Sequence, residues 1–361
     1  MSLTPRPGIL DVAPYAGGEA EAPGFAAPIR LASNENPLGA SPRAQAAYKA
    51  LSAELHRYPD GGAEALRRAI AEHHGLDPAR IVCGNGSDEL ISLLIRAYAG
   101  PGDEVLYSAH GFLMYPIAAR TAGATPVAVP ERDLTADLDG LIARAGLRTR
   151  VVCLANPNNP TGSCLSGREL ERLVAGLPDH VLLLLDAAYA EYVMRNDYED
   201  GAKLVESSSR VVMTRTFSKI HGLAGLRLGW AYASAEVADV LNRMRGPFNV
   251  TAPALAAGLA AIEDRDHAAR SRDHNARWLQ WFRQETSALG LDPRPSDGNF
   301  VLLRFPGGTG RDAGTALAWL KGRGILVRGM APYGLPDCLR VTIGTETETR
   351  AVVAALAEFV S

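Results

Sequence analysis

Short apolar runs recur along the first two thirds of the chain, and stretches with helical periodicity separate them. Seven of these runs are expected to be strands: 80–83, 104–107, 125–129, 151–154, 181–185, 211–213 and 229–232. Uninterrupted apolar strands separated by helices are typical of a mostly parallel sheet that is covered on both faces. The pattern therefore predicts an α/β fold with a seven-stranded sheet, whose ligands bind at the carboxyl ends of the strands.

The last third of the chain has a different pattern, which predicts a smaller α+β domain. An alanine-rich helix begins at 252, an amphipathic segment covers 268–289, and further strands are expected at 300–305, 325–328 and 339–343. Residues 1–40 are rich in Pro, Gly and Ala and lack periodicity, which favours an arm packed over another part of the protein. The expected division is an arm (1–40), a large domain (41–250) and a small C-terminal domain (251–361).

Composition narrows the possible partners. With 361 residues the chain suits two domains that share a cleft. A net charge of −3 argues against a nucleic-acid or membrane-surface partner. The longest apolar run is too short to span a bilayer, and the N-terminus lacks the apolar core of a signal peptide. Four scattered cysteines without Cys-x-x-Cys spacing predict reduced thiols in a cytoplasmic protein. His73 and His74 have no matching ligand at helical spacing, so no metal site is expected.

The stretch 214–227 is the strongest candidate for covalent chemistry. Lys219 follows the hydroxyls of Thr216 and Ser218, two glycines come after it at 222 and 225, and Arg227 lies eight positions later. Such a lysine, beside hydroxyl donors and a cation, suits a Schiff base with an aldehyde cofactor that carries a phosphate. A single Ser-Lys pair is more often an exposed lysine on a loop, so this interpretation depends on the motifs around it.

A second motif predicts a phosphate site. Residues 84–89, Gly-Asn-Gly-Ser-Asp-Glu, follow an expected strand and open an apolar helical run. Glycines that let the backbone approach an anion, a hydroxyl and free helix N-terminal N–H groups together form a phosphate cradle. Ser-Asp before an apolar run is also an ordinary helix N-cap, so this signal is weak by itself.

Two strand ends present further polar groups. The turn 156–162 places the Asn159 amide after one strand, and Asp186 ends the next, with Tyr189 three residues later. A carboxylate at a buried strand end costs free energy unless it meets a donor or a cation. A protonated pyridine nitrogen would be such a cation.

Together these motifs resemble the fold-type I pyridoxal-phosphate aminotransferases, and among them the histidinol-phosphate aminotransferase family. The resemblance covers nearly the whole chain, because the motifs follow one another in the family's order. They are 31–39, 57–60, the glycine turn at Gly84, 112–115, the Asn-Pro-Thr-Gly turn at 159–162, the Asp186 strand, the Lys219 loop and 339–344.

The resemblance implies pyridoxal 5'-phosphate as the cofactor and gives its site residues roles. Lys219 would bind the cofactor aldehyde and then move the proton at the substrate Cα, while Asp186 would keep the pyridine nitrogen protonated. Asn159 and Tyr189 would donate to the phenolate oxygen, and Phe112 would stack on the ring. The residues expected around the cofactor phosphate are Gly86, Ser87, Asp88, Thr216, Ser218 and Arg227, with Tyr58 reaching it from the neighbouring subunit.

The resemblance also implies a substrate pocket. Arg340 would clamp the substrate α-carboxylate, and Arg328 would bind a second anion such as a substrate phosphate. Tyr15 and Asn36 are expected to line the pocket, although an Asx-type turn explains the segment around Asn36 equally well. The Asp-Glu-Ala-Tyr motif of many relatives is Asp-Ala-Ala-Tyr here, at 186–189, which leaves specificity open.

The activity that the resemblance implies is transfer of an amino group between histidinol phosphate and 2-oxoglutarate, in histidine biosynthesis, by a cytoplasmic homodimer with shared sites. An aromatic amino acid aminotransferase, acting on phenylalanine or tyrosine, fits the same motifs. A decarboxylase of a phosphorylated amino acid on the same scaffold remains a further possibility. An effector-sensing aminotransferase-like domain is the non-enzymatic alternative, and the lack of a basic helix-turn-helix extension argues against it.

Overall fold

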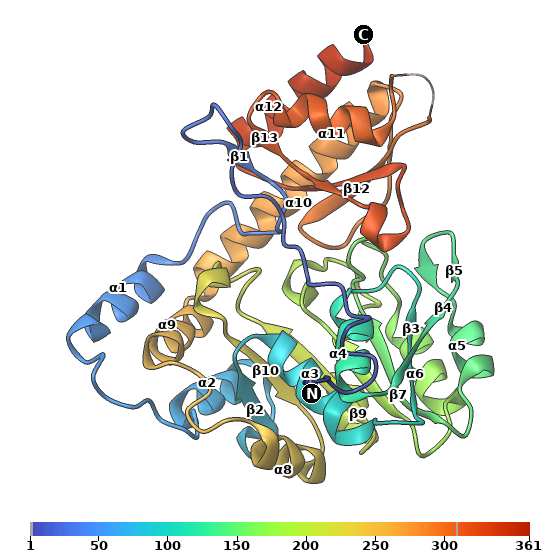
Figure 1. Ribbon diagram of the computed structural model, residues 1–361. Helices are drawn as coiled ribbons and strands as arrows, with labels where there is room; N and C mark the ends of the chain where they lie inside the picture. Colours follow the sequence, from blue (N-terminus) through green and yellow to red (C-terminus); the bar gives the residue numbers. More distant parts are fainter. Residues whose placement is uncertain (1–2, 308–309) are drawn as a thin grey trace.

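The computed structural model describes residues 3–307 and 310–361, and its larger part is built on one seven-stranded sheet (Figure 1). Neighbouring strands are parallel except at β10, which is antiparallel to both β2 and β9. The predicted fold class is confirmed. In spatial order the strands are β2 (Ile81–Gly84), β10 (Gly229–Tyr232), β9 (Val211–Thr216), β8 (Leu182–Asp186), β7 (Thr149–Ala155), β3 (Glu104–Ser108) and β4 (Thr125–Val129).

Helices cover both faces of this sheet because its strands are apolar on both sides. In β8, Leu182 and Leu184 pack in one core, whereas Leu183 and Leu185 pack in the other, as the alternation of side chains along a strand requires. One face carries α3 (Ser87–Tyr98), α4 (Met114–Ala122) and α8 (Ala235–Met244). The other carries α2 (Glu64–His74), α5 (Leu138–Arg144), α6 (Gly167–Gly176), α7 (Ala202–Ser207) and α9 (Ala252–Glu263), with α1 (Pro42–Ala50) packed on α9.

Short elements complete the larger part. They are the hairpin β5 (Glu131–Arg132) and β6 (Thr135–Ala136), and the single 3-10 turns η1 (Leu51–Ala53), η2 (Pro78–Arg80), η3 (Ala190–Tyr192) and η4 (Ala224–Leu226).

The smaller part has a four-stranded antiparallel sheet and its own apolar core. Its strands, in spatial order, are β11 (Asp292–Pro293), β12 (Phe300–Arg304), β15 (Cys338–Thr342) and β14 (Arg328–Gly329). The helices are α10 (Arg265–Ala288), α11 (Ala313–Lys321) and α12 (Glu346–Val360), and η5 (Ala331–Tyr333) lies between β14 and β15. Within the residues described, no helix is long and apolar enough to cross a membrane.

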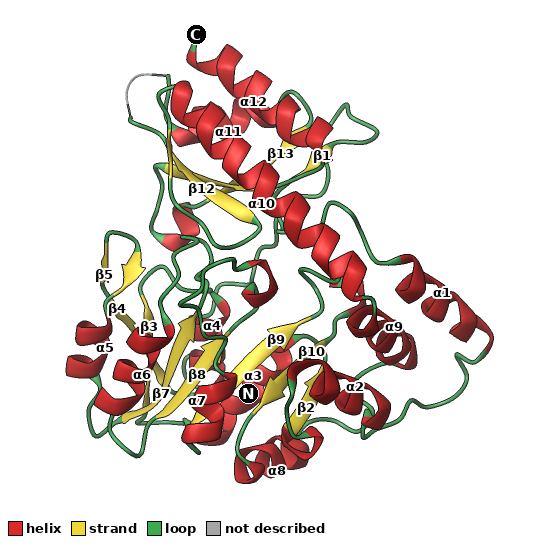
Figure 2. Cartoon of the chain, turned by 180° about the vertical axis from the view of Figure 1, so that it is seen from behind, coloured by secondary structure: helices red, strands yellow, loops and turns green. Residues whose placement is uncertain are grey.

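The alanine-rich helix α9 packs with the larger part, against α1 and α2, and its buried Ala254 and Ala257 belong to the larger core. Asp264 then caps α10, which runs from the end of α9 into the smaller domain (Figure 2). On these contacts we propose that the small domain begins with α10, later than the expected boundary at 251. The arm lies on the small domain of its own chain, because β1 (Ile29–Arg30) pairs in parallel with β13 (Ile325–Leu326).

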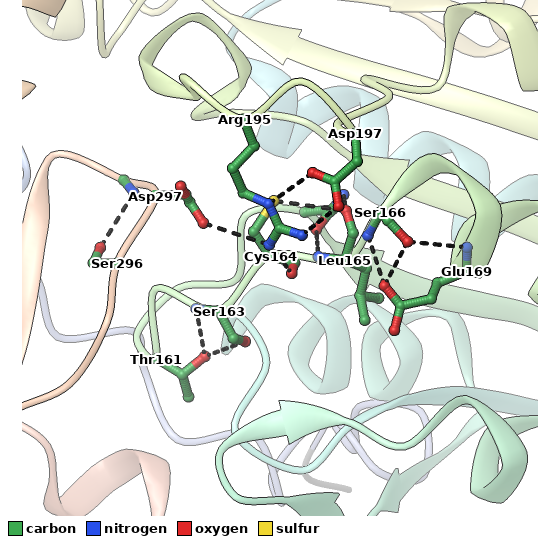
Figure 3. A network of polar contacts seen from close by, with 12 residues as sticks. Thr161, Ser163, Cys164, Leu165, Ser166, Glu169, Arg195, Asp197, Ser296 and Asp297 are labelled. Atoms are coloured by element: carbon green, nitrogen blue, oxygen red, sulfur yellow. Dashed lines mark hydrogen bonds and ion pairs between the residues drawn. The ribbon is translucent and has the colours of Figure 1, made fainter.

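The two domains meet beside the loop that follows β7 (Figure 3). The backbone N–H of Asp297 donates to the carbonyl of Gly162 at 3.0 Å. The Asp297 carboxylate lies 3.9 Å from Arg195, which Asp197 holds through two hydrogen bonds of 2.9 and 2.8 Å. Partly exposed ion pairs of this kind contribute at most about 1 kcal/mol each. The contact therefore sets where the small domain touches the Asn159 loop more than it stabilises the fold.

Candidate active site

A cavity of about 280 Å³ lies where the ends of β7, β8 and β9 meet β14, β15 and the arm. The structure brings most of the expected site residues to its wall. These are Tyr15, Ser87, Asp88, Phe112, Asn159, Asp186, Tyr189, Thr216, Ser218, Lys219, Arg227, Arg328 and Arg340. The wall is thus assembled from the large domain, the small domain and the arm.

Three expected residues do not line the cavity. Gly86 borders it as the residue before α3, where a Cβ atom would lie 2.6 Å from an Arg227 nitrogen. Asn36 is buried behind the Lys219 loop, and its amide donates to the Ile220 carbonyl at 2.7 Å and to Ser271 at 3.0 Å. In this structure Asn36 therefore holds that loop instead of facing the pocket. Tyr58 is 83% exposed at the surface.

Lys219 lies on the turn after β9 and is half-buried in the wall of the cavity. Its Nζ donates to the Ser33 carbonyl at 3.3 Å and lies 5.7 Å from the centre of the Tyr189 ring. Burial, and next the positive charge of Arg340, lower the pKa of Lys219 to about 8. A lysine with such a pKa has an appreciable neutral, nucleophilic fraction near neutral pH.

Asp186 is a buried carboxylate at the end of β8. The Tyr115 hydroxyl donates to one oxygen at 3.0 Å, and the Thr214 hydroxyl donates to the other at 3.3 Å. Burial outweighs these hydrogen bonds and raises the pKa of Asp186 to about 6. No Lys, Arg or His of the residues described forms an ion pair with it, so the group is suited to a cation brought by a ligand.

The side-chain oxygens of Tyr189 and Asn159 each accept one hydrogen bond, so their O–H and N–H groups remain free to donate. Asn34 donates to the Tyr189 oxygen at 2.8 Å, and Arg340 donates to the Asn159 amide oxygen at 2.6 Å. The Tyr189 proton and the Asn159 Nδ2 group are then the donors that remain. Burial raises the pKa of Tyr189, so its hydroxyl stays protonated at neutral pH. Together the two side chains offer a pair of donors to one acceptor.

One end of the cavity is built for an anion. Among the residues described, no side chain caps the N-terminus of α3, so its first N–H groups have no side-chain acceptor there. Arg227 lies beside it, donates to the Ser218 hydroxyl at 3.3 Å and forms an ion pair with Asp88 at 3.1 Å. Asp88 thus contacts the arginine of this end, while Ser87, Thr216 and Ser218 provide hydroxyls to the wall.

The opposite side of the cavity carries two arginines from neighbouring strands. Arg340 donates to Asn159 and to the Ala32 carbonyl, each from a different Nη atom, and its Nε is buried without a partner. One N–H on each Nη is therefore left for a ligand. Arg328 donates to the Ala16 carbonyl at 2.7 Å, and its guanidinium lies 5.5 Å from the centre of the Tyr15 ring.

The sequence interpretation missed three residues that act on the expected site. Tyr115 and Thr214 bind Asp186, and Asn34 binds Tyr189. Tyr115 belongs to the same motif as Phe112. Thr214 lies two positions before Thr216 in β9 and therefore points to the same face of the sheet. The sequence could have indicated both residues. Asn34 had only its place in a polar segment, two residues before Asn36.

Comparison with known proteins gives one consistent family. The family model "Aminotransferase class I and II" matches residues 26–356. Histidinol-phosphate aminotransferase from Paramagnetospirillum magneticum is 58% identical, over 99% of this chain and 98% of the relative. The same enzyme from Rhodospirillum centenum is 60% identical, over 98% of each chain. The crystal structure of histidinol-phosphate aminotransferase from Sinorhizobium meliloti, in complex with pyridoxal 5'-phosphate, has a TM-score of 0.88 at 30% identity and covers 98% of this chain and 97% of that one.

Proposed function

Because this chain belongs to the aminotransferase class I and II family, we propose that it transfers the amino group of histidinol phosphate to 2-oxoglutarate, in histidine biosynthesis. The chain is an aminotransferase, with an amino donor and a 2-oxo acid as its substrates. The name shared by two relatives of 58% and 60% identity supports histidinol phosphate as the donor. The observation in the structure that carries the choice is a pair of arginines facing one cavity.

The cavity fits pyridoxal 5'-phosphate on two features of the wall. The uncapped N-terminus of α3 and Arg227 form an anion site for the phosphate. Asp186 is a carboxylate that lacks a cation, as a protonated pyridine nitrogen requires. When bound, this group withdraws electrons from the bonds at the substrate Cα.

The side chains then have distinct roles in the reaction. Lys219, with its lowered pKa, would bind the cofactor aldehyde. Once the substrate amine has replaced Lys219 on that aldehyde carbon, the free lysine would take the proton from the substrate Cα. The Tyr189 hydroxyl and the Asn159 Nδ2 group would each donate a hydrogen bond to the phenolate oxygen of the cofactor. Phe112 lines the same cavity and would stack on the ring. Tyr115 and Thr214 would fix the orientation of the Asp186 carboxylate that would bind the ring nitrogen.

The two arginines explain how one site accepts both substrates. Arg328 and Arg340 are register partners in the antiparallel pair of β14 and β15, so their side chains lie on the same face. Glutamate presents an α-carboxylate to the two N–H groups that Arg340 has left. Histidinol phosphate has no α-carboxylate, because a phosphorylated hydroxymethyl group replaces it on Cα. The expected carboxylate clamp therefore applies to glutamate and 2-oxoglutarate, and the same arginine would take the phosphate of the other substrate.

The test is a set of single half-reactions, followed by the absorbance of the bound cofactor. We expect glutamate and histidinol phosphate to convert it, and unphosphorylated histidinol to react with kcat/KM lower by about a hundredfold or more. A higher kcat/KM for phenylalanine or tyrosine than for histidinol phosphate would replace the proposal with an aromatic aminotransferase. Release of CO₂ from a phosphorylated amino acid would replace it with a decarboxylase.

We also propose a cytoplasmic homodimer with shared sites. Tyr58 and Phe248 stack on each other at the surface, with ring centres 4.7 Å apart and both side chains exposed. An apolar groove of about 340 Å³, lined in part by Tyr48 and Leu226, offers a surface to a second copy. All four cysteines are free thiols, which supports a reducing compartment.

A further inference from the structure

Arg215 is a buried cation in the middle of β9, directly between two residues of the site wall. Thr214 and Thr216 point toward Asp186 and the cavity, so the side chain of Arg215 lies on the opposite face of the sheet. Its side chain is only 3% exposed, and its guanidinium lies 5.6 Å from the centre of the Trp230 ring. An arginine in this position needs acidic partners, because burying an unpaired charge is strongly unfavourable.

The partners of Arg215 come from two other segments. One Nη donates to Glu191 at 2.8 Å, and the other donates to Asp200 at 2.5 Å. Asp200 also accepts from the N–H of Ala202 at the start of α7. Glu191 lies in η3, two residues after Tyr189. The guanidinium thus connects the strand that leads to Lys219 with the turn that carries Tyr189.

The Glu191 contact depends on this one arginine. The second oxygen of Glu191 and the Nε of Arg215 are both buried without a hydrogen-bond partner, so a single hydrogen bond joins the two groups. The nearby His221 cannot replace Arg215, because burial lowers its pKa to about 4 and leaves it neutral. Loss of the Arg215 contact would remove the only hydrogen bond of the Glu191 side chain among the residues described and leave η3 held by the packing of Ala190 and Tyr192.

The structure assigns to Arg215 the role of a positioning residue: through Glu191 it fixes the Tyr189 hydroxyl relative to Lys219. On the cavity side, Tyr189 is held by Asn34 and by a T-shaped contact with the Phe300 ring, 5.3 Å between ring centres. On the far side, η3 is held through Glu191 and by the packing of Ala190 in the core. This inference rests on the proposed function only in that Tyr189 donates to the cofactor, and it is independent of the identity of the amino donor.

Two carboxylates on the same guanidinium give a matched pair of variants. Glu191→Gln weakens the contact that leads to Tyr189, whereas Asp200→Asn weakens the contact that leads to α7, which contributes no residue to the cavity. The readout is the pH midpoint at which the visible absorbance of the bound pyridoxal group titrates. Tyr189→Phe removes one donor to the phenolate and should raise that midpoint by about 1 pH unit.

We expect Glu191→Gln to raise the midpoint by about half a unit or more, and Asp200→Asn to leave it unchanged. In the Tyr189→Phe background, Glu191→Gln should add no further shift, since the two changes act through one group. Arg215→Lys keeps the positive charge but loses the two Nη donors of the guanidinium, and should behave like Glu191→Gln. Thermal unfolding of each apo variant reports whether it is folded.

Three results would overturn the assignment: equal shifts in the Glu191 and Asp200 variants, additive shifts in the double variant, or no shift in Glu191→Gln. If Arg215→Lys does not fold, the Glu191 and Asp200 pair still decides. If histidinol phosphate proves not to be the amino donor, these midpoints are unaffected, because no amino donor is present in the titration.

Discussion

The protein environment disfavours the charged forms of two ionisable side chains in the site. Asp186 has a pKa raised to about 6 and Lys219 a pKa lowered to about 8, in both cases chiefly by burial. The folded apoprotein therefore binds more protons than the unfolded chain at Asp186 between about pH 4 and 6, and fewer at Lys219 between about pH 8 and 10.5. Stability falls with rising pH in the first window and rises in the second.

Replacing the Asp186 charge tests both stability and chemistry. Asp186→Asn should remove the loss of apoprotein stability between about pH 4 and 6, which denaturant unfolding at a series of pH values would measure. In the loaded enzyme the same change should slow half-transamination by about a thousandfold, equivalent to about 4 kcal/mol. Near-normal rates would show that the carboxylate does not act on the ring nitrogen.

Lys219 is expected to be the attachment point of the cofactor. The chain has three other lysines, at 49, 203 and 321, and none of them lines the cavity described. Borohydride reduction of the wild type should place the pyridoxyl label on the Lys219 peptide, and Lys219→Ala should carry no label after dialysis. Peptide mapping by mass spectrometry provides the measurement, and a label on any other lysine would contradict the assignment.

At the residue scale, the sequence was sufficient where a motif fixes a side chain by its own backbone. Lys219 follows β9, Asp186 ends β8 and Arg340 lies within β15, and all three line the cavity. Asn34 and Asn36 could not be ranked from the sequence. Asn34 adopts a left-handed φ of +55° and turns its amide to Tyr189, whereas Asn36 is drawn to Ser271 of α10, and tertiary contacts decide both.

At the scale of elements, continuous apolar runs predicted every strand of the large sheet, but β9 is longer than its pattern indicated. The expected strand ends at 213, whereas β9 continues to Thr216 through the buried Arg215. An arginine in a central strand is tolerated here because Glu191 and Asp200, which are far from it in sequence, neutralise it. A periodicity argument has no access to such pairing.

The contact between β10 and the start of α3 leaves no room for a side chain at Gly229. A Cβ atom there would lie 2.4 Å from the Ser87 nitrogen and 2.6 Å from the Gly86 carbonyl carbon. Gly229→Ala should displace the N-terminus of α3 and weaken binding of pyridoxal phosphate by about tenfold or more, at a stability cost of about 1–3 kcal/mol. Equilibrium dialysis measures the affinity. Gly100→Ala, in open space just after the same helix, is the matched control, and equal losses in both would refute the argument.

Arg340 in β15 and Arg328 in β14 are expected to affect the two amino donors differently. Arg340→Ala should raise KM for glutamate and for histidinol phosphate alike, because each presents its anion to this residue. Arg328→Ala should lower kcat/KM for histidinol phosphate by about tenfold more than for glutamate, since a phosphate dianion gains most from a second cation. Steady-state kinetics with both donors provides the comparison. Equal losses for the two donors in the Arg328 variant would mean that this residue does not bind the phosphate.

At the scale of the molecule, the sequence predicted two domains and an arm with a boundary at 251, whereas the helix contacts favour the later boundary at α10 that we propose. The alanine-rich helix from 252 was assigned to the small domain, whereas α9 ends at Glu263 and Asp264 caps a separate helix, α10. Alanines allow close helix packing, and α9 uses them against α1 and α2. Composition shows that a helix can pack closely but not which neighbour it packs on.

The exposed Tyr58 predicts that complete sites exist only in a dimer. Within its own chain this tyrosine stacks on Phe248 and is not part of the cavity wall, yet the family resemblance places it at the partner's cofactor phosphate. Tyr58→Ala should therefore weaken cofactor binding, while Lys219→Ala abolishes turnover. Each variant alone should be impaired as a homodimer, and sedimentation should show a dimer for both.

Refolding the two variants together tests whether Tyr58 belongs to the site of its own chain or to the site of the partner chain. If Tyr58 acts on the partner's site, a mixed dimer has one site with both residues intact and one with neither, so activity should return. With random pairing, about half of the dimers are mixed and each has one complete site, so the mixture should regain about a quarter of wild-type activity. If Tyr58 serves its own chain, every site in the mixed dimer lacks one residue, and the mixture should be no more active than the average of the two homodimers. Activity at that average would therefore exclude the shared site.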